Sequence, residues 1–214
     1  MKRFLIIAIL VLSVVSANAK IHLAAEAGFG NTGIKPGYNT SSSGMYGIMV
    51  GKEFKSILID IGVRSWSCNY TALKDFDLNG LSSSAFFDGQ IVNISVPISA
   101  GIYLPIGKVN ILAKAVLAPT FLTQHHEKAE PSSSFFPGVV LEDYSKRYYT
   151  AAGLDIGLGY SFSKRISLDA KYSLLGYLSD LKHDPILISS TPVIIGEGER
   201  PKINAFSLQL NLFL

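Results

Sequence analysis

The sequence predicts an all-β protein, an eight-stranded antiparallel up-and-down transmembrane β-barrel. Eight segments alternate large apolar and polar residues, and short and long connections between them alternate strictly along the chain. Each segment also keeps one face almost free of charge. The composition agrees, because 48% of the residues are hydrophobic and only 16% are charged, whereas soluble domains have about 25% charged residues.

The first nineteen residues have the features of a secretory signal peptide. Lys2 and Arg3 form a basic start, residues 4–15 are apolar, and Ala17-Asn18-Ala19 is a small-x-small cleavage site. The apolar run, about a dozen residues, is too short to span a bilayer as a helix. We therefore expect a signal peptide over residues 1–19, removed by cleavage, and one barrel domain over residues 20–214.

The charge and the cysteine content of the mature chain argue against nucleic-acid binding and against a fold held by internal disulfides. Without Lys2 and Arg3, 17 of the 19 basic residues remain against 16 acidic ones, so the charge gives no reason to expect a nucleic-acid partner. The single cysteine, Cys68, cannot form an internal disulfide.

Eight strands are expected in chain order. Their alternation covers residues 20–30, 44–54, 56–69, 91–104, 108–123, 147–162, 166–178 and 203–214. The last strand must pair or leave an exposed edge, and its simplest partner is the first strand, which closes the barrel. Pro97 and Pro119 lie inside strands and lack a ladder donor, so we expect bulges at both.

The connections fall into two kinds. Three are tight turns, near Lys55, Gly107 and Lys164. The other four are long and polar and cover residues 31–43, 70–90, 124–146 and 179–202. Consecutive connections of an up-and-down barrel lie at opposite ends, so the turns share one rim and the loops the other. Membrane barrels have this asymmetry, with short periplasmic turns and long outer loops.

The apolar face of the strands carries one charge, Lys52, beside a tight turn. In chain order this face runs from Ile21 to Phe29, Tyr46 to Phe54, Ile57 to Val63, Val92 to Leu104, Val109 to Leu117, Tyr148 to Phe162, Ile166 to Leu174 and Phe206 to Leu214. A soluble lipocalin-like barrel would turn this face inward. The opposite face, however, is rich in Gly, Ser and Ala, which suit the narrow interior of an eight-stranded barrel better than a water-facing exterior.

Aromatic residues mark both ends of the apolar face. Phe29, Tyr46, Phe121, Tyr148 and Phe206 lie at the long-loop ends, and Phe54, Tyr160 and Phe162 lie near the short turns. Aromatic girdles at both membrane interfaces are typical of barrels in lipid. This pattern predicts that the apolar face contacts lipid.

On these patterns the chain resembles the small outer-membrane β-barrel proteins, the OmpA/OmpX-like, porin-family group with eight strands. The resemblance covers residues 20–214 and implies the outer membrane of a Gram-negative cell envelope, with outer-membrane lipid and the barrel-assembly machinery as partners. Such proteins usually end on an aromatic residue that this machinery reads. This chain instead ends Phe213-Leu214.

Charged residues on the opposite, polar face are the candidate functional residues. They are Glu26, Asp60, Arg64, Lys114, Asp155, Asp169 and Lys171. Unpaired charges in a narrow interior are costly, so we expect them to form an ion-pair network that plugs the barrel. The alternative is a gated ion path that opens when these pairs rearrange.

Apolar residues on the expected loops are candidates for partner contact. Two Ser triplets are each followed closely by a Phe pair, and the fourth loop carries an apolar run. The candidates are Phe86, Phe87, Phe135, Phe136, Ile194 and Ile195. Apolar groups on protruding loops often mark interaction surfaces, although they can equally pack on one another.

We expect no enzyme, no cofactor and no metal site. Lipid A deacylases on similar barrels carry a His-x-Ser pair, and no histidine of this chain has Ser two residues later. His125 and Glu127 could share a face, but two ligands are too few for a structural zinc site. The expected function is therefore membrane structure or surface interaction through the loops, with a narrow channel as the alternative and a lipid A-modifying enzyme as a distant third.

Overall fold

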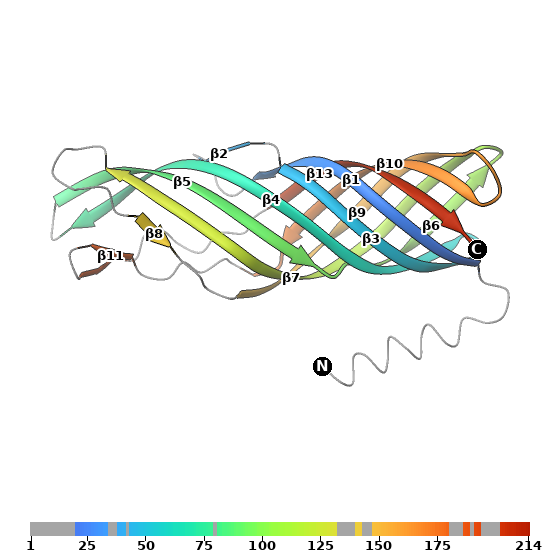
Figure 1. Cartoon of the computed structure of the whole chain (residues 1–214), viewed down its shortest axis with the longest axis horizontal. Coiled ribbons are helices and arrows are strands. Elements are labelled where there is room, and N and C mark those ends of the chain that lie inside the picture. The colour runs from blue at the N-terminus through green and yellow to red at the C-terminus, as the bar shows by residue number, and fades with distance from the viewer. Residues whose placement is uncertain are drawn as a thin grey trace, which may run out of the picture.

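The computed structural model describes residues 20–33, 38–41, 43–78, 81–131, 140–142, 147–179, 186–188, 191–193 and 202–214. Within these residues the chain forms a closed eight-stranded antiparallel barrel (Figure 1). Its strands are β1 (Lys20–Gly33), β3 (Ser43–Phe54), β4 (Ile57–Leu78), β5 (Leu81–Ser95) with β6 (Ile98–Ile106), β7 (Val109–Pro131), β9 (Arg147–Ser161), β10 (Ile166–Tyr177) and β13 (Lys202–Phe213). This part of the chain contains no helix that could cross a bilayer.

The terminal strand closes the barrel. β13 pairs with β1 from His22–Phe213 to Gly33–Lys202, and on its other side it pairs with β10. The Leu214 amide also donates to the Ile21 carbonyl, at 2.8 Å. The predicted closure between the first and last strands is confirmed, so neither of these two strands is left with a free edge in the barrel wall.

Three strands continue well past the others at the loop end. β4 and β5 form a hairpin that closes between Leu78 and Leu81, and β7 pairs with β5 as far as Pro131. Much of the segments 70–90 and 124–146, expected as loops, is therefore strand. Residues 82–84 are three serines and residues 124–130 are mostly polar, so neither stretch has the alternation that predicts strands, but each strand offers its neighbour a row of backbone hydrogen-bond partners.

Short strands add to this end of the molecule. β2 (Tyr38–Thr40) pairs with β4, and β8 (Val140–Glu142) pairs with β7. β11 (Ile186–Ile188) and β12 (Thr191–Val193) pair with each other.

The two strand prolines cause no bulge. The register between β6 and β7 at Ile98–Leu117 continues unchanged in β5 at Ser95–Thr120, across Pro97. β7 keeps one register with β9 on both sides of Pro119. The predicted bulges at both positions are wrong. Each proline lacks an amide donor, but its carbonyl still accepts a hydrogen bond from the neighbouring strand: Val96 donates to the Pro119 carbonyl at 2.8 Å, and Gly62 donates to the Pro97 carbonyl at 3.1 Å.

The register shift lies elsewhere, on β7 opposite Val92 and Asn93. Pro97 does interrupt the predicted strand 91–104, which the structure divides between β5 and β6.

Strand alternation decides which side chains face out. The large outward side chains form an exposed apolar band, in which Ile48 is 71% and Tyr148 74% exposed. Among the residues with described side chains, every girdle aromatic predicted from the sequence is exposed. Such a continuous apolar exterior fits a hydrocarbon environment and not water.

Candidate functional site: the closed lumen

Inward-facing side chains fill the barrel in three layers. A charged layer occupies the middle, where Arg64, Lys114 and Lys171 are each at most 1% exposed. An apolar layer lies toward the loops and a smaller one toward the turns. An eight-stranded barrel is just wide enough for side chains to fill it, and this arrangement leaves the charged layer enclosed between two apolar layers.

The loop-side half of the charged layer is a box of two acids and two bases. Glu26 on β1 accepts from the Arg64 Nε of β4 and from the Lys171 Nζ of β10. Asp155 on β9 lies 3.3 Å from Arg64 Nη2 and 3.6 Å from Lys171 Nζ. Four strands are joined through these pairs, and the charges in the box balance.

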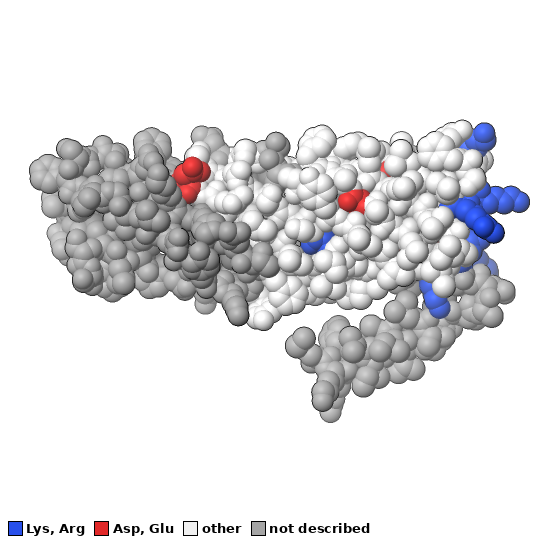
Figure 2. All heavy atoms as spheres, viewed as in Figure 1, with Lys and Arg blue, Asp and Glu red and all other residues white. Residues whose placement is uncertain are grey.

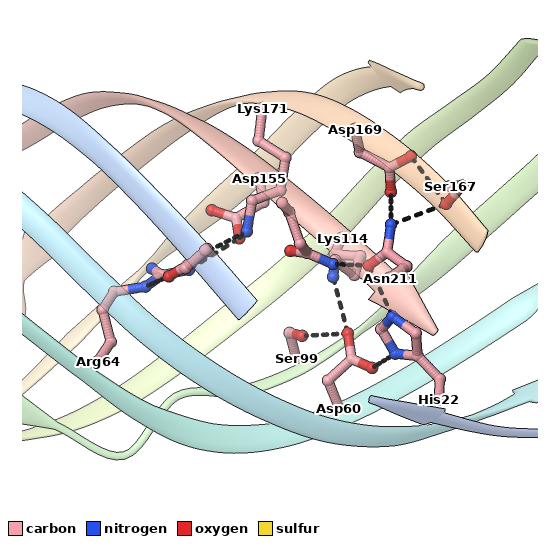
Figure 3. Close-up of polar contacts among 12 residues, drawn as sticks. His22, Asp60, Arg64, Ser99, Lys114, Asp155, Ser167, Asp169, Lys171 and Asn211 are labelled. Atoms are coloured by element: carbon pink, nitrogen blue, oxygen red, sulfur yellow. Dashed lines mark hydrogen bonds and ion pairs between the residues drawn. The ribbon is translucent and has the colours of Figure 1, made fainter. Parts of the chain in front are cut away.

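The turn-side half centres on Asp60 of β4. Its Oδ2 accepts from Lys114 Nζ at 2.7 Å and from the Ser99 hydroxyl at 3.3 Å, and its Oδ1 lies 3.0 Å from His22 Nδ1 (Figure 3). Asp169 forms no ion pair among the described residues. Instead its Oδ2 accepts from Asn211 Nδ2 at 2.7 Å.

His22 completes this half of the layer. Asn211 Nδ2 donates to Asp169 and to the Ser167 hydroxyl, so its Oδ1 is turned toward His22 Nε2, at 2.7 Å. Both ring nitrogens of His22 therefore face oxygen atoms, Asp60 Oδ1 and Asn211 Oδ1.

The loop-side layer is apolar, although the sequence predicts a polar face toward the lumen. It consists of Met45, Trp66, Cys68, Val116, Ala118, Tyr149, Ala151, Leu175, Tyr177, Ile203 and Ala205. The ring of Tyr177 lies 6.5 Å from Trp66 and 5.6 Å from Tyr149, measured between centroids. Large rings at inward positions therefore fill the lumen on the loop side of the charges.

The turn-side layer is smaller and opens into a cavity. Leu58, Tyr103, Leu112 and Phe213 form it, with the Phe213 ring stacked on His22 at 5.1 Å. Below them a cavity of about 340 Å³ forms the mouth of the barrel at the turn end, and Lys20, Lys108 and Lys164 are among the residues that line it. The penultimate residue is thus an inward plug, and the outward terminal residue is Leu214, 65% exposed.

The structure brings the seven residues of the expected lumen network into one layer. Six of them form ion pairs with one another, and Asp169 joins through hydrogen bonds. His22 and Asn211 were not among the seven residues expected in this network. Both alternate with outward residues on the first and last strands, so their inward direction was readable, but their contact across 189 residues was not.

The loop candidates have a different outcome. Phe86 and Phe87 lie on β5, but their side chains are outside the described part of the structure, as are residues 135, 136, 194 and 195 in full. Their role in partner contact stays a prediction. Across the described residues, no group of three or more His, Cys, Asp or Glu side chains could hold a metal ion.

Comparisons with known proteins agree with this architecture. The family model for the outer membrane protein beta-barrel domain matches residues 4–212. No curated protein matches the sequence. A crystal structure of Neisserial surface protein A is similar in fold, with a TM-score of 0.50 and 11% sequence identity over 91% of this chain and 99% of that chain.

Two further structures are similar at lower scores. OprG from Pseudomonas aeruginosa gives a TM-score of 0.48 with 8% identity, over 92% of this chain and 96% of that chain. Ail, the attachment invasion locus protein of Yersinia pestis, gives 0.45 with 11% identity, over 92% and 100%.

Proposed function

Because this chain belongs to the family of outer membrane protein β-barrel domains, we propose that it is a non-enzymatic barrel with a closed lumen. In this proposal the barrel is a membrane-embedded support, and its outer end makes the functional contacts. The chain reaches the Gram-negative outer membrane through a signal peptide over residues 1–19, and the barrel-assembly machinery inserts it there.

The packing of side chains inside the barrel is the observation that supports this proposal. Arg64, Lys114 and Lys171 are buried and paired to carboxylates, and an aromatic layer lies directly on their loop side. An ion crossing the barrel would have to separate these pairs, and leaving one buried charge without its partner costs about 3–5 kcal/mol.

The loop end supplies the surface. β4, β5 and β7 extend beyond the barrel there as a continuous sheet (Figure 1). A rigid scaffold that presents a projecting element is a common way to build an interaction surface. We propose that this projection and the loops around it contact a partner in the envelope or outside the cell.

Planar-bilayer recording tests the closed lumen. The purified barrel should give no steady unitary conductance, and neither should a charge-conserving Lys114→Arg control. A steady, defined conductance that disappears in Lys114→Ala or Arg64→Ala would contradict the proposal. A binding screen directed at the loop end, with a variant lacking residues 79–84, then tests the surface.

A narrow gated channel is the second candidate, and one observation favours it. On β13 the buried atoms Ser207 Oγ and Gln209 Oε1 have no hydrogen-bond partner among the described protein atoms. Buried polar atoms of this kind usually bind water, and a file of water beside the charged layer could become a path. The same recordings distinguish the two functions.

A further inference from the structure

The turn end of the barrel carries a strong excess of positive charge. Among the residues with described side chains, six basic residues lie there, against Glu53 and the terminal carboxylate. They are Lys20, Lys52, Lys55, Lys108, Lys164 and Arg165, here termed the basic ring. Figure 2 shows this concentration of Lys and Arg at one end, with none comparable on the visible apolar wall.

The basic ring encircles the barrel. Lys20 begins β1, Lys55 lies in the β3–β4 turn, Lys108 in the β6–β7 turn, and Lys164 and Arg165 in the β9–β10 turn. The order of strands around the barrel places these four positions at every second strand boundary. A protein or a polymer strand docking from one side would meet only part of such a ring. A lipid leaflet would meet all of it.

Two lysines lie at the level of the lipid interface. Lys55 Nζ lies 5.9 Å from the centroid of the Phe54 ring, and Lys108 Nζ lies 6.0 Å from that of Tyr160. Both rings belong to the exposed girdle on the turn side. Long side chains that cover girdle rings and end in a charge are suited to the boundary between hydrocarbon and headgroups.

Three lysines of this ring, Lys55, Lys108 and Lys164, are available for an external partner. No ion pair within the described residues involves Lys55, Lys108 or Lys164, and all three are exposed. The opposite end offers a contrast, because the exposed charges described there are Lys202 and Asp88, of opposite sign.

We propose that the basic ring binds the phosphate groups of anionic phospholipids in the leaflet that surrounds the turn end. In a barrel with periplasmic turns this is the inner leaflet of the outer membrane. The protein would thereby collect anionic phospholipid around itself, a property independent of whether its lumen conducts or its loops bind a partner.

Spin-label lipid selectivity measures this directly. The full barrel is reconstituted in phosphatidylcholine with spin-labelled phosphatidylglycerol or spin-labelled phosphatidylcholine, and the two association constants are compared. We expect phosphatidylglycerol to be favoured by about fivefold, the factor that corresponds to one cation at an anionic surface. The preference should disappear near 1 M salt, where the Debye length is about 3 Å.

Matched variants assign the effect to the basic ring. Lys55→Gln, Lys108→Gln, Lys164→Gln and Arg165→Gln together should strongly reduce the preference, with Lys20 and Lys52 left in place. The charge-keeping variant Lys55→Arg, Lys108→Arg, Lys164→Arg should retain it, as should Lys202→Gln at the other end. Equal selectivity in the wild type and the glutamine variant would overturn the proposal, as would a wild-type preference insensitive to salt. The salt dependence of the wild-type barrel tests the proposal even if the glutamine variant does not fold.

Two further experiments distinguish anionic phospholipid from other anionic partners. Because Lys20, Lys108 and Lys164 also line the turn-end mouth, free phosphate is added in excess at matched ionic strength. Loss of lipid selectivity with phosphate but not with chloride would assign the charges to a soluble anion and overturn the proposal. The proposal would also be overturned if the barrel showed no lipid selectivity but cosedimented with peptidoglycan sacculi, and if this cosedimentation were lost in the glutamine variant of the basic ring.

Discussion

Lys114 holds its ammonium group against a carboxylate inside the barrel. Its Nζ lies 2.7 Å from Asp60 Oδ2, and both side chains are 0% exposed. The net stability that such a pair adds is small, because the cost of burying both charges offsets much of their attraction.

The first prediction concerns this pair. Lys114→Met leaves Asp60 with fewer partners for its buried charge and should lower the free energy of unfolding by about 3–5 kcal/mol. The double variant Asp60→Asn with Lys114→Met removes both charges and should recover a large part of this loss. Urea unfolding in lipid vesicles, followed by Trp66 emission, measures both.

An exposed lysine provides the control for Lys114. Lys202→Met, at the loop end, should change the free energy of unfolding by less than about 0.5 kcal/mol. If the double variant were as unstable as the single one, the two residues would not act as a pair.

Trp66 gives a test that needs no substitution. It is the single tryptophan of the chain and is 5% exposed, within the loop-side apolar layer. Its emission should be blue-shifted and should resist both acrylamide in water and brominated acyl chains in the bilayer. Strong quenching by brominated lipid would mean that β4 faces the other way, since a one-residue slip turns every side chain to the opposite face.

At the scale of the strand, glycine allows neighbouring strands to approach. Gly153 on β9 faces inward, and a Cβ there would overlap the backbone carbonyl oxygen of Leu174 on β10. Gly176 on β10 is different, because a Cβ there would meet nothing within 4 Å.

These two glycines form a matched pair for prediction. Gly153→Ala requires the backbone of β9 and β10 to separate locally, so it should destabilise the barrel by about 1–3 kcal/mol. Gly176→Ala should be tolerated within about 0.5 kcal/mol. Urea midpoints of the two variants provide the measurement, and equal midpoints would contradict the close approach at Gly153.

At the scale of the whole molecule, closure depends on β13. This strand pairs with β1 and with β10, and its inward Gln209, Asn211 and Phe213 also fill the lumen. Losing it would leave two strand edges without partners in lipid, where backbone groups have no water to bind.

Truncation tests this dependence. Removal of residues 208–214 should abolish refolding into vesicles, seen as loss of the band whose gel mobility changes on heating. Leu214→Ala keeps the backbone hydrogen bond to Ile21 and should refold normally. A truncated chain that still gave a heat-modifiable band would show that an open sheet is stable in lipid.

Alternation in the sequence was sufficient for the wall of the barrel. Each residue of a strand points to one face or the other, so the apolar exterior and the inward charges follow directly from the pattern. The projecting ends of β5 and β7 did not follow, because residues 82–84 are three serines and residues 124–130 are mostly polar, so neither stretch has this period. The effect of Pro97 and Pro119 did not follow either. It depends on whether the carbonyl of each proline still accepts a hydrogen bond from the neighbouring strand.

The sequence by itself determined that seven charged residues face the lumen, and that its two terminal strands need a partner. Only the tertiary structure decided which charges meet. His22 reaches Asn211, and Glu26 reaches Lys171, across 189 and 145 residues of chain. The physical reason is that direction follows from a local period of two residues, whereas contact across a barrel depends on the stagger between all eight strands.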